Sequence, residues 1–336
     1  MTDIVEQQII EENEASQAGR SDGMMRAVIY EDYGDANVLH LGEKPFPRRL
    51  PGQVTIQVKV SSVNPIDYRL RRGEMKGLLP GGFPRVPGYD VAGTIVDCDT
   101  DGPFNIGDRV FAFLDQTRGG AMAEYAVCAV DATAELPDDV SFSDAAAIPL
   151  AGTTALQSLR DHGEMKPNDR VLINGASGGV GMFAVQIAKA HGCTVDAVAS
   201  ARNEEFCRSL GADGFIDYKT ENFLKSEKKW DLIFDVAGTA NYLQARSVMT
   251  ENSRYVSTEP DVKGMMTTLL TWPFSKSGKI MLARPCAKDL RELMRLHQAG
   301  NLKITIDSTF PLDRAADAHR RLESGVDQGK VIVMHT

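Results

Sequence analysis

The sequence lacks the features of several protein classes. Its five cysteines are odd in number and include no C-x-x-C pair, which argues against a disulfide framework or a structural zinc ribbon and favours a reducing cytoplasm. No apolar stretch approaches the roughly 18 residues of a membrane span, and the longest, residues 145–156, is broken by Pro149 and Gly152. The formal net charge of −9 argues against a basic surface for nucleic acid or anionic lipid. We therefore expect a cytoplasmic globular protein with no nucleic-acid or membrane partner.

Residues 1–24 also lack the signals of a targeting segment. They are acidic, without the basic and apolar regions of a signal peptide or the arginines of a mitochondrial presequence. We expect a flexible N-terminal extension, with the folded part beginning at Met25.

The remaining length predicts two domains, because 336 residues are too many for one ordinary core. Residues 25–149 contain short β-like runs separated by glycine and proline; one of them, VTIQVKVSSV at residues 54–63, alternates apolar and polar positions as a half-buried strand does. Over residues 150–290, strand-like and helix-like segments alternate, which is typical of βαβ units and a parallel sheet. Residues 291–336 add further strand and helix.

A glycine-dense turn stands at the start of the βαβ pattern. Residues 171–181 read VLINGASGGVG, an apolar run that stops in the turn, and a helix-like segment follows. Placed on the pattern G-x-G-x-x-G, the turn has its key positions at Ala176, Gly178 and Gly181, so alanine replaces the first glycine. The free N–H groups of such a helix suit a pyrophosphate. We expect cofactor contacts from Ala176, Ser177, Gly178, Gly179, Val180 and Gly181.

The end of the next strand indicates which dinucleotide is bound. An acidic residue there would hold the ribose hydroxyls of NAD, but this strand ends at Ser200, Arg202 follows, and no carboxylate appears before Glu204. A hydroxyl and a guanidinium suit a 2′-phosphate, so NADPH is favoured. The alternative is that Arg202 is a solvated surface charge.

Several motifs, taken in order, resemble one family. They are VNPIDYRLRRG from Val63, VPGYDVAGTIV from Val86, GDRVF, GGAMAEYAV, GASGGVG, LGAD, IDYK and QGKVIVM. The chain resembles the quinone oxidoreductase branch of the medium-chain dehydrogenase/reductase superfamily. The resemblance implies an α/β protein with a GroES-like β-rich catalytic domain, a doubly wound Rossmann domain, and a C-terminal segment, residues 291–336, that returns to the catalytic domain.

The resemblance also implies a reaction without zinc. Zinc-containing relatives carry a cysteine in the first motif and Gly-His-Glu in the second, where this chain has Val63–Asp67 and Gly88-Tyr89-Asp90. Without a Lewis acid, hydride transfer is easiest onto acceptors that delocalise the resulting charge themselves, namely quinones and α,β-unsaturated carbonyls. An apolar small molecule of this kind is the expected substrate. Two alternatives stay open: an enoyl-thioester reductase, and a non-catalytic NADPH-binding sensor or interaction protein.

The first motif supplies the expected catalytic residues. By resemblance Asn64 lies beside the nicotinamide ribose, and the Tyr68 hydroxyl can donate a hydrogen bond or proton to the substrate oxygen. Tyr68 is equally able to be a packed phenol with water as the proton source. Asp67 and Arg71 have the spacing of an internal ion pair and are interpreted as scaffold.

Further cofactor contacts follow from the resemblance alone. Thr153 matches a position near the nicotinamide amide and Tyr218 one that flanks the adenosine phosphate. Gly238 belongs to the loop under the nicotinamide, and Lys330 reaches the cofactor from the C-terminal segment.

We also expect a homodimer joined through the edge strands of the two parallel sheets, because an unpaired edge needs cover. The segment RYVST at residues 254–258 is the expected edge strand. Residues 261–285 are more apolar than a surface loop and are interpreted as an acceptor pocket, a subunit contact or ordinary core.

Overall fold

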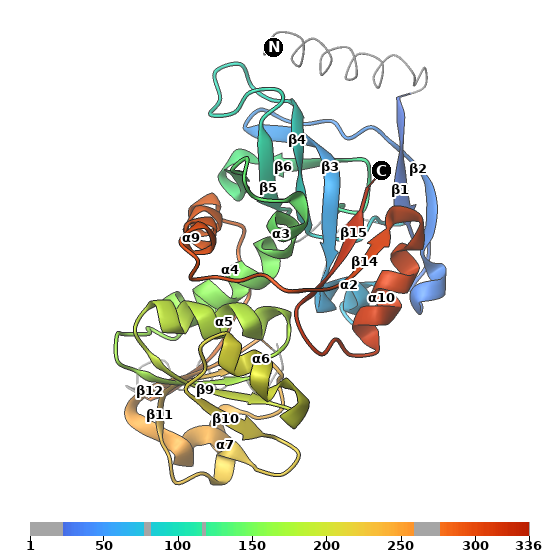
Figure 1. The fold of residues 1–336 in the computed structure, drawn as a ribbon. Coiled ribbons are helices and arrows are strands. Elements are labelled where there is room, and N and C mark those ends of the chain that lie inside the picture. The colour runs from blue at the N-terminus through green and yellow to red at the C-terminus, as the bar shows by residue number, and fades with distance from the viewer. Residues whose placement is uncertain (1–22, 77–81, 116–118, 259–275, 336) are drawn as a thin grey trace.

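The computed structural model describes residues 23–76, 82–115, 119–258 and 276–335 (Figure 1). The expected N-terminal extension and residues 261–275 of the apolar segment therefore lie almost entirely outside the described residues. Within the described ranges, no helix is both long and apolar enough to cross a membrane.

A largely antiparallel sheet forms the first part of the structure. Among the described residues it has seven strands, in the order β14-β15-β3-β4-β5-β7, with β6 also paired to β3. The long central strand β3 alternates in burial only from Ile56 to Val60; its other residues except Gln53 are buried, including the polar Thr55, Ser61 and Ser62. The strands are β3 (Gln53–Val63), β4 (Asp90–Asp97), β5 (Arg109–Phe113), β6 (Tyr125–Ala129), β7 (Thr133–Glu135), β14 (Ile306–Pro311) and β15 (Lys330–Met334). Beside it, β1 (Met24–Ile29) and β2 (His40–Pro45) form an antiparallel pair.

A parallel sheet forms the second part. Its described strands follow the order β10-β9-β8-β11-β12-β13, and every pair is parallel. The order reverses beside β8, the point where such sheets bind ligands at the carboxyl ends of their strands. The strands are β8 (Arg170–Asn174), β9 (Thr194–Ala199), β10 (Gly214–Asp217), β11 (Trp230–Asp235), β12 (Met249–Ser257) and β13 (Ser277–Ile280). This is the expected doubly wound arrangement, and the α/β prediction is confirmed.

Helices connect and cover the two sheets (Figure 1). The described α-helices are α2 (Pro65–Arg71), α3 (Phe142–Ala147), α4 (Pro149–Gln157), α5 (Gly179–Ala190), α6 (Glu204–Ser209), α7 (Tyr242–Ala245), α9 (Ala287–Gln298) and α10 (Ala315–Glu323). Helix α9 packs against α4 and β7, and α10 packs against α2, β14 and β15. The last elements of the chain, red in Figure 1, thus lie beside the blue first ones.

The expected edge strand is not at an edge. Strand β12, which contains RYVS of the RYVST segment, pairs with β11 on one side and with β13 on the other. Among the described strands the edge on this side is therefore β13. Its sequence, SGKI, is too short and too polar to be recognised as a strand. The segment becomes a strand by pairing with β12, a neighbour that only the fold provides.

Candidate active site

The glycine turn joins β8 to α5, as expected. The left-handed residue is Gly175, with φ +87°, so the tight turn that the first glycine provides lies one position before Ala176. The side chain of Ala176 is fully buried, and its N–H donates to the carbonyl of Val198 at 3.1 Å. Helix α5 begins at Gly179, where the sequence predicted a helix start.

At two other positions of the turn, glycine is explained by the space around its Cα. A Cβ at Gly181 would lie 2.1 Å from the carbonyl oxygen of Gly175, so only glycine lets the helix approach the turn this closely. A Cβ at Gly178 would have its nearest neighbour at 3.7 Å. The protein itself leaves room there, in front of the helix N-terminus, and that room suits a group lying against the backbone.

Asn203 connects the two turns that follow β8 and β9. Its Nδ2 lies 3.0 Å from Ser177 Oγ and 3.3 Å from Ser200 Oγ, and it donates at 3.2 Å to the carbonyl of Asp327. The amide oxygen accepts from Gln328 Nε2 at 3.1 Å. Sequence reasoning missed Asn203; the available signal was an asparagine directly after the expected phosphate-selecting residues.

The residues expected at the adenosine end differ in exposure. Ser200 is buried, whereas the side chains of Arg202 and Tyr218 are largely exposed. Arg202 forms an ion pair with Asp327 in the loop before β15. The guanidinium is therefore more than an isolated surface charge, but its partner here is a carboxylate.

Asn64, at the start of α2, is buried and held from both sides. Lys330 Nζ donates to its Oδ1 at 2.5 Å, and its Nδ2 donates to Asp90 Oδ2 at 2.8 Å. An ammonium only donates and a carboxylate only accepts, so these partners fix the orientation of the amide. One N–H of Asn64 is left to point elsewhere.

Lys330 joins this group to the glycine turn. Its Nζ lies 3.5 Å from Asp90 Oδ2, while a Cβ at Gly179 would lie 3.0 Å from its Cδ. Burial lowers the pKa of Lys330, and Asp90 opposes that shift. Asp90 also accepts from Ser62 Oγ at 2.5 Å and from the N–H of Leu150 at 2.7 Å. The structure thus brings Lys330, Asn64 and the start of α5 together.

The prediction of an ion pair between Asp67 and Arg71 is wrong, because each side chain has other partners. Asp67 is the third residue of α2, and its carboxylate turns back to accept from the N–H of Asn64 at 2.7 Å and from that of Gly88 at 3.0 Å. Capping the helix start leaves it unable to reach along the helix. Burial raises the pKa of Asp67 to about 7, with Asp90 adding to the shift.

Arg71 instead contacts the C-terminal helix. Its guanidinium pairs with Glu323 of α10 and donates to the carbonyl of Gly34 at 2.7 Å. Glu323 also accepts from Arg72 at 2.5 Å, and the Arg72 guanidinium lies 5.1 Å from the centre of the Tyr68 ring. Tyr68, in the middle of α2, is thus partly buried against a cation that Glu323 of α10 holds.

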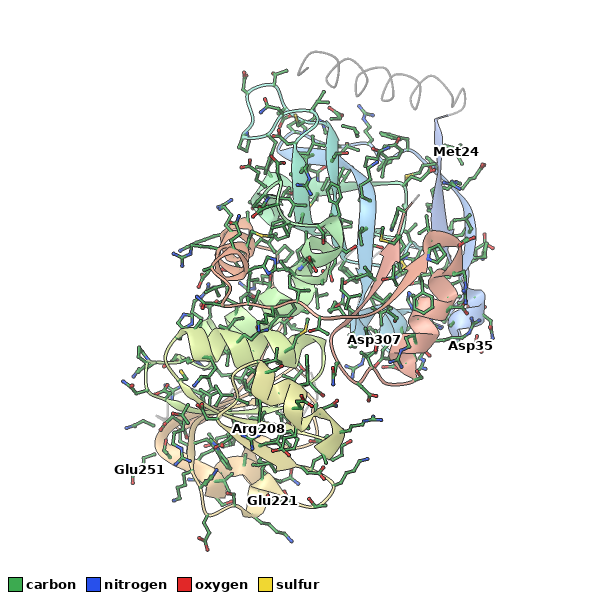
Figure 2. The ribbon with its side chains drawn as sticks, viewed as in Figure 1. Met24, Asp35, Arg208, Glu221, Glu251 and Asp307 are labelled. Carbon is green, nitrogen blue, oxygen red and sulfur yellow. The ribbon has the colours of Figure 1, made fainter. Side chains whose placement is uncertain are left out.

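Helix α10 is fixed on both flanks. Arg321 pairs with Asp307 of β14 at 2.6 Å, and Arg320 donates to Asn37 Oδ1 at 2.5 Å. Figure 2 labels Asp307 on one side of this helix and Asp35 on the other. Asp35 lies two residues before Asn37 in the sequence. The helix that holds α2 is thus tied to the sheet and to the N-terminal strands.

The two remaining expected residues lie on α4 and in the loop after β11. Thr153, on α4, is fully buried, and its Oγ1 has no hydrogen-bond partner among the described residues. Gly238 takes φ +63° in the loop after β11, where its N–H donates to Asp235 Oδ1 at 2.9 Å.

A dinucleotide fits these features. An unpaired buried hydroxyl such as that of Thr153 costs about 1–3 kcal/mol, which a ligand amide would offset. The open space at Gly178 and the free N–H groups of α5 suit a pyrophosphate. The described residues contain no cluster of three or more histidine, cysteine, aspartate or glutamate side chains placed to hold a metal ion.

Comparisons with known proteins agree with this architecture. Residues 50–138 match the model of the alcohol dehydrogenase GroES-like domain, and residues 210–333 match that of the zinc-binding dehydrogenases. The chain is 35% identical to the chloroplast envelope quinone oxidoreductase homolog of Arabidopsis thaliana over 92% of its own length and 98% of that protein. It belongs to the quinone oxidoreductase branch of the medium-chain dehydrogenase/reductase superfamily.

Two further proteins resemble the chain in sequence or in structure. The NADPH-dependent alkenal/one oxidoreductase of A. thaliana is 32% identical over 92% of this chain and 79% of that protein. The quinone oxidoreductase from Coxiella burnetii superimposes with a TM-score of 0.83, at 32% identity, over 93% of this chain and 99% of its own. The predicted family, the GroES-like and Rossmann fold class and the oxidoreductase class are confirmed.

Proposed function

We propose that this oxidoreductase is an NADPH-dependent, zinc-independent reductase that transfers hydride to a quinone or an α,β-unsaturated carbonyl. The observation that carries the proposal is Asn64, whose amide is fixed by Lys330 and Asp90 beside the glycine turn. The names of the relatives, a quinone oxidoreductase homolog and an alkenal/one oxidoreductase, support the two substrate classes.

The proposed roles of the residues follow from their positions. A bound reduced nicotinamide supplies the hydride. The backbone N–H groups at the start of α5 hold the pyrophosphate, Thr153 Oγ1 faces the nicotinamide amide, and Asn64 orients the adjoining ribose with its remaining N–H. The Tyr68 hydroxyl or a water molecule donates a hydrogen bond or proton to the acceptor oxygen. Tyr218, Gly238 and Lys330 complete the proposed contacts.

We further propose NADPH over NADH as the preferred cofactor. Ser200 and Arg202 lie at the end of β9 and directly after it, where the ribose hydroxyls of a dinucleotide bind in this fold. A hydroxyl and a guanidinium suit a 2′-phosphate. The name of the alkenal/one oxidoreductase includes NADPH, which supports the same choice.

Assembly and location are also proposals. We propose a homodimer joined through the parallel sheets of two copies of the chain. We keep the cytoplasm as the proposed location, although the names of two relatives place them in the chloroplast.

The test is to follow NADPH absorbance while the purified protein is supplied with a panel of quinones, enals, enones and enoyl thioesters. Turnover of quinones or enones, lost in Asn64→Ala, supports the proposal. Turnover restricted to thioesters would assign the alternative reductase. Tight NADPH binding with no turnover of any acceptor would favour a sensor or interaction protein.

A further inference from the structure

We propose that Asp327 is a residue that sets cofactor preference, because its carboxylate takes the guanidinium that a 2′-phosphate requires. The inference rests on the proposed dinucleotide-binding function and concerns the adenosine end of that site. Arg202 and Asp327 form an ion pair between the turn after β9 and residues 325–329, which we term the C-terminal strap.

The strap is held in a defined conformation over the glycine turn. Gly325 and Gly329 have φ values of +90° and +78°, which favour glycine. A Cβ at Gly329 would lie 2.2 Å from the carbonyl oxygen of Thr305, and the N–H of Gly329 donates to the carbonyl of Ser177 at 3.3 Å. The backbone therefore presents Asp327 at a fixed place.

Asn203 ties the strap to both nucleotide turns. One amide nitrogen lies within 3.3 Å of Ser177 Oγ, Ser200 Oγ and the carbonyl of Asp327. These contacts use the backbone of Asp327, so its carboxylate is free to serve Arg202. The same amide thus connects the backbone of Asp327 with Ser200, the residue expected to suit a 2′-phosphate.

The negative charge of Asp327 works against binding of a phosphorylated ribose beside Arg202. Side-chain exposure is 66% for Arg202 and 43% for Asp327, so water and a ligand both reach the pair. A 2′-phosphate must displace Asp327 from the guanidinium and then remain beside a like charge. NADH, whose ribose carries a neutral hydroxyl there, leaves the pair intact. Asp327 thus acts as an internal substitute for the phosphate and lowers discrimination between the two cofactors.

The direct test is Asp327→Asn, which keeps the shape and the backbone contacts and removes the charge. Exposed ion pairs contribute little, so NADPH should bind about three- to tenfold more tightly, with NADH unchanged. The measurement is equilibrium titration of the full chain with NADPH and NADH, and with the fragments 2′,5′-ADP and 5′-AMP. The gain should appear with 2′,5′-ADP and be absent with 5′-AMP.

Two further variants make the result specific. Asp138→Asn changes the net charge equally at a fully exposed side chain in the loop after β7 and should leave all four dissociation constants unchanged. Arg202→Ala should weaken NADPH and 2′,5′-ADP and leave NADH and 5′-AMP unchanged.

The possible results separate this inference from the proposed function. Dinucleotide binding that does not respond to Asp327→Asn overturns the inference and leaves the function standing. Weaker NADH binding in Asp327→Asn also overturns it, because Asp327 would then hold the ribose hydroxyls. Failure of the wild-type protein to bind either dinucleotide overturns both.

Discussion

At the level of single residues, the site depends on how few hydrogen bonds a buried amide can make. Asn64 spends its oxygen on Lys330 and one N–H on Asp90, so one N–H is available to a ligand. The two partners fix the orientation of the Asn64 amide, because the ammonium of Lys330 can only donate a hydrogen bond and the carboxylate of Asp90 can only accept one. Tyr68 has no comparable restraint on its hydroxyl among the hydrogen bonds described above.

This difference leads to a prediction for Tyr68→Phe, which removes only the hydroxyl. If the phenol donates to the acceptor oxygen, turnover of an enone should fall by about a hundredfold, the loss typical of one donor in a water-excluded site. Turnover of a quinone should fall less, because the anion formed by its reduction is weakly basic and depends less on a hydrogen-bond donor. Steady-state kinetics on one quinone and one enone are the measurement, with Asn64→Ala as the variant that lowers both. Full activity of Tyr68→Phe on both substrates would assign the proton to water.

Asp67 gives a prediction about pH. Its pKa is about 7 in the folded protein, against an ordinary value of 3.8, so the folded state binds more protons than the unfolded state between about pH 4 and pH 7. The contribution of Asp67 to the free energy of unfolding is therefore full below pH 4 and is lost as the pH rises to 7, by about 1.4 kcal/mol per unit at most.

Asp67→Asn should remove this dependence. Urea denaturation between pH 5 and pH 8 should show a flatter stability profile for the variant than for the wild type, although losing one acceptor lowers its overall stability by about 1 kcal/mol. Asp101→Asn, at an exposed position, should keep the wild-type profile. Parallel profiles for wild type and Asp67→Asn would show that Asp67 is ionised throughout.

At the level of elements, the contact between α10 and α2 joins residues far apart in sequence. Arg71 is fully buried and pairs with Glu323, and His319 of α10 is also fully buried, with no hydrogen-bond partner for either ring nitrogen among the described residues. Burial lowers the pKa of His319 to about 3, and Arg71 adds to the shift. The histidine is therefore held neutral.

His319→Leu should make the protein less sensitive to acid. Because the pKa of His319 is lower in the folded state, the wild type loses stability as the pH falls below 6.5. The advantage of the variant should grow by about 1.4 kcal/mol per pH unit below that value. Urea midpoints at pH 7 and pH 5 measure this, with His40→Leu, at an exposed position, as the control. An equal loss in wild type and His319→Leu would refute it.

The elements also show what the sequence could predict. The turn from Asn174 to Gly181 was predictable, because its strand, glycines and helix are consecutive. The partner of Arg71 was not, because the fold alone brings Glu323 to it, and the nearby carboxylate of Asp67 was already used to cap α2. The link from Asn203 to Asp327 was missed for the same reason. Local patterns predicted the elements and the glycine turn, whereas contacts between residues far apart in the sequence required the fold.

At the level of the whole molecule, the proposed homodimer gives a prediction about mass in solution. Strand β13 is the last described strand on one side of this sheet, and Leu282, two residues beyond it, is 65% exposed. Light scattering of a dilution series at micromolar concentration should report twice the chain mass of 36.6 kDa. A mass equal to one chain at every concentration would contradict the proposed dimer.

The position of β15 has a consequence for the order in which the protein is synthesised. This strand lies between β14 and β3, so the sheet that begins near residue 53 stays open until residues 330–334 have left the ribosome. The parallel sheet uses strands between residues 170 and 280 and is complete earlier. A nascent chain whose residues up to 300 have left the ribosome should therefore contain a folded second sheet beside a first sheet in which Val60–Val63 of β3 still lack their partner β15, and that part of β3 is the one a chaperone would need to cover.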